Sequence, residues 1–337
     1  MQLPLNLHNP SSVGIPTSST QSRVRRYRTL DLFSGIGGIR LGFERYNFQT
    51  VFSNDFEPSC KITSDLNFSA PQMTLGDITQ ILPESLPEFD LLLGGFPCQA
   101  FSVAGYRQGF SDQKGRGNLF FTIAHILEEL QPTAFFLENV KNLQGHDRGR
   151  TFQIILETLK QLGYSVRFEV LNTMKHGNLP QNRERIYIVG FRDALQAASF
   201  EFPPQVDLKL KVQDLLDDSV PDRYYYDGKP LYPRLVNAVN SKETVYQWRR
   251  KYVRENKQQV CPTLTANMGT GGHNVPIILD NKGIRKLTPR ECARFQGFPD
   301  SYQLPPIADS LLYKQIGNSV SVSVVEAIAH EIRRVLE

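Results

Sequence analysis

Short apolar runs alternate with longer amphipathic segments from about Tyr27 to Arg192. The apolar runs have the length of buried strands, and the segments between them repeat apolar residues at the spacing of one helix face. This alternation predicts βαβ units, an α/β class and a largely parallel sheet. The predicted strands are residues 29–33, 50–53, 90–93, 134–137, 165–171 and 186–191, and the predicted helices are 38–46, 58–66, 119–130 and 152–162.

The alternation is lost beyond Arg192, where residues 193 to about 281 contain Pro-Pro, a run of three tyrosines and glycine-rich stretches. This composition predicts a separate, smaller and irregular domain. Order returns at Leu287, and the chain closes with a helix whose apolar residues fall largely on one face. That stripe is most simply buried against the first domain. The predicted organisation is a disordered tail (1–27), an α/β domain (28–192), the smaller domain (193–283) and a C-terminal return to the α/β domain (284–337).

The composition is that of an ordinary globular protein, with 337 residues, 40% hydrophobic and 21% charged, and a formal net charge of +4. This mild basic bias permits a nucleic-acid partner without requiring one. No cysteine pair has CxxC spacing and the six histidines are scattered, so we expect no metal site. Without an apolar run of membrane-spanning length or a secretory signal, we expect a cytoplasmic protein with free thiols.

The first candidate site is residues 31–38 (DLFSGIGG), an apolar strand that runs into a glycine-rich turn and a helix. Glycines there allow a ligand to approach the backbone beside a helix N-terminus. Asp55, at the end of the next strand, can accept from the two ribose hydroxyls of a nucleoside cofactor. The G-x-G-x-x-G pattern that binds a pyrophosphate is absent, which favours an adenosine ligand without one. Asp77 is placed to accept from the adenine amino group. A tight structural turn, NAD binding and a solvated Asp77 are the alternatives.

Three further segments bring reactive groups to the same sheet edge. Residues 93–102 (LGGFPCQAFS) place Cys98 in a rigid turn after a strand, which is a poor place for a cysteine that merely packs. Glu138 follows another strand. Arg183 and Arg185, at alternate positions before the strand 186–191, point to one side if that segment is extended.

A thiol, a carboxyl and two guanidiniums beside an adenosine pocket suit methylation of cytosine at carbon 5. A thiolate that adds to carbon 6 turns the ring into an enamine, whose carbon 5 is nucleophilic. Glu138, kept neutral by burial, can protonate or hydrogen-bond N3. Arg185 can hold the carbonyl O2, and Arg183 can bind phosphate and stabilise the Cys98 thiolate.

These motifs, together with residues 315–320 (QIGNSV), resemble those of the bacterial cytosine-C5 DNA methyltransferases of restriction–modification systems. The resemblance covers roughly residues 28–192 and 284–337, with the motifs in the family's order. It implies a Rossmann-like fold that binds S-adenosyl-L-methionine, Cys98 as the nucleophile, and Glu138, Arg183 and Arg185 at the base. The residues it implies for the cofactor are Phe33, Gly35, Gly37, Asp55, Asp77, Ile78, Leu119 and Asn318.

The resemblance also implies that residues 193–283 recognise a double-stranded DNA sequence. This segment contains a basic and aromatic cluster around Arg249 and Arg250, although a solvated basic helix face is the alternative. The run 262–266 (PTLTA) resembles a family element and includes Thr263. The glycine-rich stretch 99–118 is expected to be a mobile loop that closes over DNA with the cytosine flipped out, with Ser102 at the DNA.

Four rival functions are weaker. Methylation of RNA cytosine shares the same scaffold, and the sizeable recognition segment favours DNA. A cysteine hydrolase lacks a histidine in the strand-end motifs. Exocyclic amino methylation uses an (Asn/Asp)-Pro-Pro-(Tyr/Phe) element, whereas this chain has Phe-Pro-Cys at 96–98. A DNA-binding regulator without catalytic activity would not need all of these reactive groups.

We expect a monomer that protects host DNA from a paired restriction endonuclease, without required physical contact between the two.

Overall fold

A seven-stranded sheet forms the centre of the larger domain in the computed structural model, which describes residues 25–97, 119–256, 258–269 and 276–337. β8 runs antiparallel to its neighbours β5 and β6, and the other pairings are parallel. The chain builds outward from β1 to β2 and β3, and then continues on the other side of β1 with β4. The strands in spatial order are β3 (Thr74–Leu75), β2 (Phe48–Asp55), β1 (Tyr27–Leu32), β4 (Leu91–Gly95), β5 (Ala134–Val140), β8 (Glu184–Phe191) and β6 (Ser165–Asn172).

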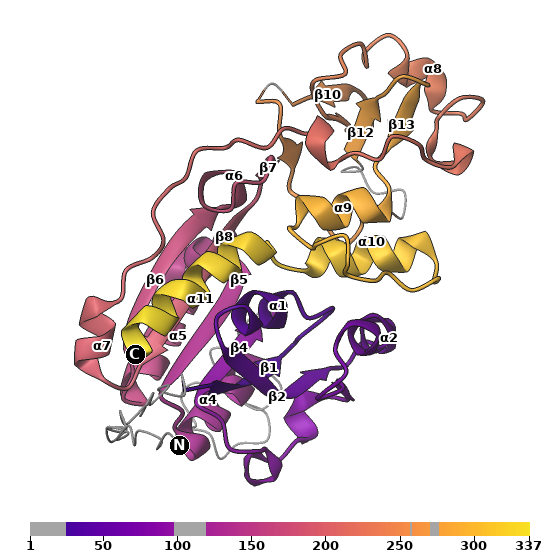
Figure 1. Cartoon of the computed structure of the whole chain (residues 1–337). Helices are drawn as coiled ribbons and strands as arrows, with labels where there is room; N and C mark the ends of the chain where they lie inside the picture. Colours follow the sequence, from indigo (N-terminus) through magenta and orange to yellow (C-terminus); the bar gives the residue numbers. More distant parts are fainter. Residues whose placement is uncertain (1–24, 98–118, 257, 270–275) are drawn as a thin grey trace, which may run out of the picture.

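Helices cover both faces of this sheet (Figure 1). α1 (Gly38–Glu44) and α11 (Val322–Leu336) pack on one face, and α4 (Leu119–Leu130) and α5 (Arg150–Gln161) pack on the other. α11 lies so close to α1 that a Cβ on Gly42 would come within 2.8 Å of a Val325 methyl carbon. The apolar stripe of the closing helix is thus buried against the first domain. The sheet with helices on both faces confirms the predicted α/β class.

The predicted strands and helices of this domain are all present, with ends displaced by a few residues. Two strands were not predicted, β3 and β7 (Gln181–Asn182), because two residues are too few to show an alternating pattern. The other helices of this domain are α2 (Pro58–Asn67), α6 (Thr173–His176) and α7 (Ala194–Ser199), with 3₁₀ turns at Ile78–Gln80, Pro83–Ser85 and Lys141–Gly149.

The smaller domain contains regular structure where the sequence predicted an irregular segment. Its four strands form an antiparallel sheet in the order β10 (Val253–Glu255), β9 (Tyr246–Trp248), β12 (Pro276–Leu279) and β13 (Ile284–Lys286). Strands of three or four residues carry too little alternation to be recognised. The boundary predicted at residue 284 falls inside the β12–β13 hairpin. The helical pieces here are α8 (Tyr232–Leu235) and 3₁₀ turns at Gln213–Leu215 and Asp222–Tyr224.

α9 (Pro289–Phe295) and α10 (Asp309–Asn318) lie between the small sheet and the larger domain (Figure 1). A second connection is the parallel pairing of β7 with β11 (Cys261–Pro262). The apolar side chains of this middle layer form one cluster with residues of α2 and of the segment after α7. The smaller domain therefore meets the larger one through both packing and strand pairing.

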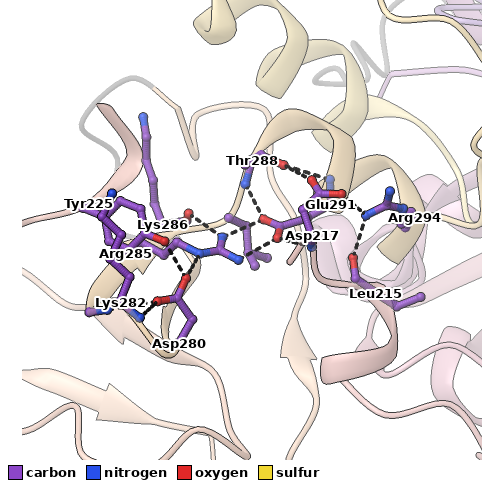
Figure 2. A network of polar contacts seen from close by, with 12 residues as sticks. Leu215, Asp217, Tyr225, Asp280, Lys282, Arg285, Lys286, Thr288, Glu291 and Arg294 are labelled. Atoms are coloured by element: carbon purple, nitrogen blue, oxygen red, sulfur yellow. Dashed lines mark hydrogen bonds and ion pairs between the residues drawn. The ribbon is translucent and has the colours of Figure 1, made fainter. Parts of the chain in front are cut away.

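A buried ion pair anchors the small sheet to α9 (Figure 2). The guanidinium of Arg285, on β13, donates to both carboxylate oxygens of Glu291 at 2.8 Å, and neither side chain is exposed. Glu291 also accepts from the backbone N–H groups of Thr288 (2.7 Å) and Asp217 (2.9 Å). Asp280 bonds the remaining Nε–H of Arg285 at 2.5 Å. These contacts satisfy the buried charges, which is the condition under which a buried pair is tolerated.

Candidate active site

A cavity of about 390 Å³ lies at the carboxyl ends of β1, β2, β4 and β5. The start of β8, the end of α10 and the first residues of α1 and α2 also line it. This is the point where the strand order reverses between β1 and β4, and open α/β sheets bind their ligands at such a point. The cavity brings together seven of the residues predicted from the sequence: Phe33, Gly35, Asp55, Glu138, Arg183, Arg185 and Asn318.

Four residues expected at the cofactor do not line the cavity as the described residues form it. Gly37 precedes α1 with φ of 75°, and a Cβ there would come within 2.3 Å of the Phe68 ring. Asp77 is exposed and caps a 3₁₀ turn by accepting from the Thr79 N–H at 2.9 Å. Ile78 and Leu119 pack in the apolar core around α4. Their proposed cofactor contacts stay predictions.

The turn between β1 and α1 is held in an unusual conformation. Phe33 and Gly35 both have φ of 54°, a left-handed conformation that costs free energy at a phenylalanine. A Cβ on Gly35 would meet no atom of the described residues within 4 Å, so they leave the space beside this glycine open. The Gly35 N–H donates to Asp55 Oδ2 at 2.8 Å, which fixes the turn against the end of β2.

Asp55 has a structural task as well as its expected one. Its other oxygen, Oδ1, accepts from the Glu57 N–H at 2.9 Å. Burial raises the pKa of this carboxyl, while the backbone N–H bonds oppose the rise. Each carboxylate oxygen has a second lone pair. Asp55 can therefore brace the glycine turn and still accept from a hydroxyl in the cavity.

Several lining residues were not assigned a role from the sequence. Phe56 lines the cavity, and 70% of its surface is exposed. An exposed aromatic ring of this kind can stack on a purine. Lys314 and Glu57 form an ion pair at 2.5 Å between α10 and the start of α2. Gln315 accepts from Thr63 Oγ1 at 2.9 Å, and its buried Nε2 has no hydrogen-bond partner among the described residues. The motif 315–320 included Gln315, but nothing in it distinguished this residue from a structural amide.

Glu138 and Arg185 form another part of the cavity wall. Arg185 Nε lies 3.1 Å from Glu138 Oε1, and both side chains are largely buried. Burial raises the pKa of the Glu138 carboxyl, and the charges of Arg185 and Arg183 oppose this rise. The site thus holds a carboxyl that is easier to protonate than one in water, beside a fixed cation.

The end of β5 is tied to the segment that leads to the predicted nucleophile. Asn139 Nδ2 donates to the Phe96 carbonyl oxygen at 2.8 Å, and Pro97 lines the cavity. Cys98 is the next residue in the chain. Cys98 and Ser102 lie outside the described residues, as does the segment 99–118.

Arg183 has a side chain that is more deeply buried than the predicted phosphate contact requires. Its side chain is 2% exposed, and both Nη atoms donate to backbone carbonyl oxygens. Its Nε is buried and has no hydrogen-bond partner in the described part of the chain. A phosphate contact by the Nη atoms would require these carbonyl bonds to break.

A second hollow, of about 680 Å³, lies between the β9–β10 hairpin and the segment after β11. Its lining includes Arg249, Arg254 and Thr263, together with several amide side chains. Arg249 and Arg250 occupy the turn of this hairpin, where Arg249 N–H bonds the Tyr252 carbonyl at 2.8 Å, so the basic cluster is not a helix face. Thr263 Oγ1 is used internally and donates to the Asn182 carbonyl at 2.7 Å. We name this hollow the hairpin groove.

Comparison with known proteins shows the family. The model of the C-5 cytosine-specific DNA methylase family matches residues 27–334. The chain is 53% identical over 306 residues to the type II methyltransferase M.Bsp6I of Bacillus sp. (strain RFL6), covering 89% of this chain and 96% of that protein. It is 46% identical over 303 residues to the type II methyltransferase M.NgoBI of Neisseria gonorrhoeae, covering 89% and 91% of the two proteins.

Solved structures show the same fold at low sequence identity. The Entamoeba histolytica methyltransferase EhMeth superposes with a TM-score of 0.71 at 18% identity, over 93% of this chain and 99% of that one. The chain belongs to the C-5 cytosine-specific DNA methylase family. It is a DNA (cytosine-5-)-methyltransferase related to those of restriction–modification systems. Within the described residues, none of the helices combines the length and apolar content that a membrane crossing requires.

Proposed function

We propose that the protein methylates carbon 5 of a flipped-out cytosine within a specific double-stranded DNA sequence, through a covalent bond between Cys98 and carbon 6. The observation that carries this proposal is the buried Glu138–Arg185 pair, which opens into the same cavity as the glycine turn and Pro97. A base in this cavity would meet an acid, a cation and the strand end that leads to Cys98.

The cavity fits S-adenosylmethionine, which would supply the methyl group. Asp55 retains acceptor capacity for ribose hydroxyls, and the exposed ring of Phe56 offers a stacking surface for adenine. Gln315 Nε2 is a buried donor without a partner in the described part of the chain, and a polar ligand would satisfy it. Asn318, at the end of α10, lines the same space.

Cys98, Glu138 and Arg185 each have a separate role in the proposed reaction at the base. The Cys98 thiolate forms a bond to carbon 6, and the ring electrons move toward carbon 5. Glu138 donates a proton or hydrogen bond to N3, which makes the ring a better acceptor for the thiolate. Arg185 donates to O2. After carbon 5 has taken the methyl group, water accepts the carbon-5 proton. The electrons of that C–H bond restore the double bond between carbons 5 and 6, and the bond from carbon 6 to sulfur breaks to return the Cys98 thiolate.

The hairpin groove is the proposed sequence reader. Guanidinium and amide side chains suit the acceptor and donor edges of bases in the major groove. The relation to type II methyltransferases supports a partner restriction endonuclease that recognises the same sequence. Such a pairing requires a shared DNA site and no contact between the two proteins. We also propose that the enzyme acts as a monomer in the cytoplasm.

A covalent trap tests this function. Duplex DNA that carries 5-fluorocytosine at the target should form a denaturant-stable complex only with S-adenosylmethionine present, because fluorine cannot leave as a positive ion. Mass spectrometry should place the adduct on the peptide that contains Cys98, with one methyl group on the base. Unfluorinated duplex and Cys98→Ser are the matched controls. An adduct on Cys60, Cys261 or Cys292 would show that the nucleophile is not Cys98, and full turnover without an adduct would overturn the mechanism.

A further inference from the structure

Arg183 joins three segments that are far apart in the sequence. It follows β7 and directly precedes β8. Its Nη1 donates to the carbonyl oxygens of Leu264 (2.9 Å) and Gly317 (3.4 Å), and its Nη2 donates to those of Gly317 (3.4 Å) and Ser319. One planar guanidinium thus holds the segment after β11 and the end of α10 at fixed positions relative to β8.

These segments carry the walls of the two sites. Leu264 follows Thr263, which lines the hairpin groove. Gly317 and Ser319 flank Asn318, and all three line the cavity at the sheet edge. Arg183 is also two residues from Arg185, which contacts Glu138. A displacement of this guanidinium would move the base of the groove and the wall of the cavity together.

Neighbouring side chains reinforce the same junction. Gln181 Nε2 donates to the Phe295 carbonyl at 2.7 Å, and Gln181 Oε1 accepts from the Leu264 N–H at 3.1 Å. Gln296 Nε2 donates to the Ile316 carbonyl at 2.8 Å. Both glutamines are completely buried. We call the side chains of Gln181, Arg183 and Gln296, with the backbone groups they bind, the central junction.

The bonding of Arg183 is unsuited to a DNA phosphate. A phosphate ligand needs accessible donors, whereas both Nη atoms here are buried on carbonyl oxygens. Burial is also the main cause that lowers the pKa of Arg183, followed by the charge of Arg185. Only an arginine offers a planar fork that can reach several carbonyls at once, because lysine presents a single ammonium.

We propose that Arg183 is a positioning residue that holds the DNA-reading groove and the cofactor cavity in register with Glu138 and Arg185. This rests on the proposed function, which assigns DNA to the groove and the cofactor to the cavity. The role differs from the phosphate contact expected from the sequence. The proposal predicts that one substitution at Arg183 weakens the binding of two ligands at two different sites.

The test measures binding of Arg183→Lys to two probes separately, S-adenosylhomocysteine by calorimetry and a target duplex by fluorescence anisotropy. Loss of charge-assisted bonds to carbonyls should raise the Kd of each probe roughly tenfold. Weaker DNA binding together with a wild-type affinity for S-adenosylhomocysteine would assign Arg183 to the DNA alone and overturn the proposal. Unchanged affinities with slower methyl transfer would also overturn it, since they would assign Arg183 to the thiolate.

Arg333→Lys is the matched control. Arg333 is also buried and donates to a backbone carbonyl, that of Arg25 at 2.7 Å, but it lies on α11 away from both sites. The Arg333→Lys variant should have a lower melting temperature and wild-type affinities for both probes, which separates positioning from a general loss of stability.

If Arg183→Lys does not fold, Gln296→Met removes another bond of the central junction from a residue that lines neither site. It should weaken both probes about threefold, and wild-type affinities would overturn the proposal. These binding measurements do not depend on the covalent adduct, so failure of the proposed mechanism is detected separately.

Discussion

Arg185 Nε lies 3.1 Å from Glu138 Oε1, although the two residues are 47 positions apart in the sequence (185 minus 138). They meet because β8 runs antiparallel to β5, which brings the start of β8 to the end of β5. The pair therefore combines a carboxyl whose pKa is raised by burial with a cation that opposes the rise. This balance decides at which pH the carboxyl can donate a proton.

Glu138→Gln should slow methyl transfer by roughly 10²–10⁴-fold at neutral pH, because glutamine keeps a hydrogen bond but cannot transfer a proton. The wild-type single-turnover rate should fall as pH rises through the raised pKa of Glu138, since only the protonated form donates. The variant should lose this dependence. Rapid-quench assays from pH 5 to 9 measure both effects. A variant with the same rate and pH profile as wild type would remove Glu138 from the mechanism.

Cys98→Ser should abolish methyl transfer while the affinity for S-adenosylhomocysteine stays nearly unchanged. A serine hydroxyl provides almost no alkoxide at neutral pH, whereas a thiol is partly ionised. Tritiated-methyl incorporation and calorimetry measure the two quantities. Cys292→Ser is a suitable comparison, because Cys292 is a buried thiol on α9 that does not line the cavity and whose pKa is raised, chiefly by burial. Methyl transfer by Cys98→Ser at the wild-type rate would exclude Cys98 as the nucleophile.

Asp31→Asn should stabilise the protein most at high pH. Asp31, on β1, is fully buried and neither carboxylate oxygen has a partner among the described residues; burial raises its pKa to about 8. The folded state therefore holds this proton more tightly than the unfolded state, and stability falls as pH rises from about 4 to about 8. Asparagine has similar size and stays neutral. Thermal melts from pH 6 to 9 should show a growing advantage of the variant, and a constant difference would contradict the assignment.

Glu291→Gln should destabilise the protein by roughly 3–5 kcal/mol, because it leaves the guanidinium of Arg285 buried without its full partner. Chemical denaturation measures the free energy of unfolding. Glu331→Gln is the control, since the pairs of Glu331 with His330 and Arg334 involve exposed partners and should contribute under about 1 kcal/mol. Equal effects of the two substitutions would show that the buried pair in Figure 2 does not anchor the small sheet.

Exchange of the recognition segment with a relative of different specificity should move the methylated site. The structure also predicts the better junction. An exchange of residues 193–283 cuts the β12–β13 hairpin, whereas an exchange of 193–286 transfers all four strands of the small sheet. The second chimaera should melt at a higher temperature and be more active. Bisulfite sequencing of plasmid DNA identifies the methylated cytosines. An active chimaera that still marks the original site would refute the assignment of this segment.

The sequence by itself determined the α/β class, and it predicted several residues that the structure brings to one cavity. Long amphipathic helices and buried strands have a period that local sequence displays, as for α4, whose bounds agree with the prediction. Glu138, Arg185, Asp55 and Asn318 were assigned from motifs at strand and helix ends, and they line one cavity. The small sheet was not predicted because strands of three or four residues are stabilised by their partners rather than by a visible pattern.

Only the tertiary structure decided which atoms each side chain uses. One carboxylate oxygen of Asp55 accepts from the glycine turn, and one amide donor of Gln315 has no partner among the residues that the structure describes. Arg183 was expected at a phosphate, yet its Nη atoms bind the carbonyls of Leu264, Gly317 and Ser319. Those carbonyls come from segments 81 to 136 residues away. Backbone carbonyls are present at every residue and carry no signature in the sequence, so their partners are set by packing alone.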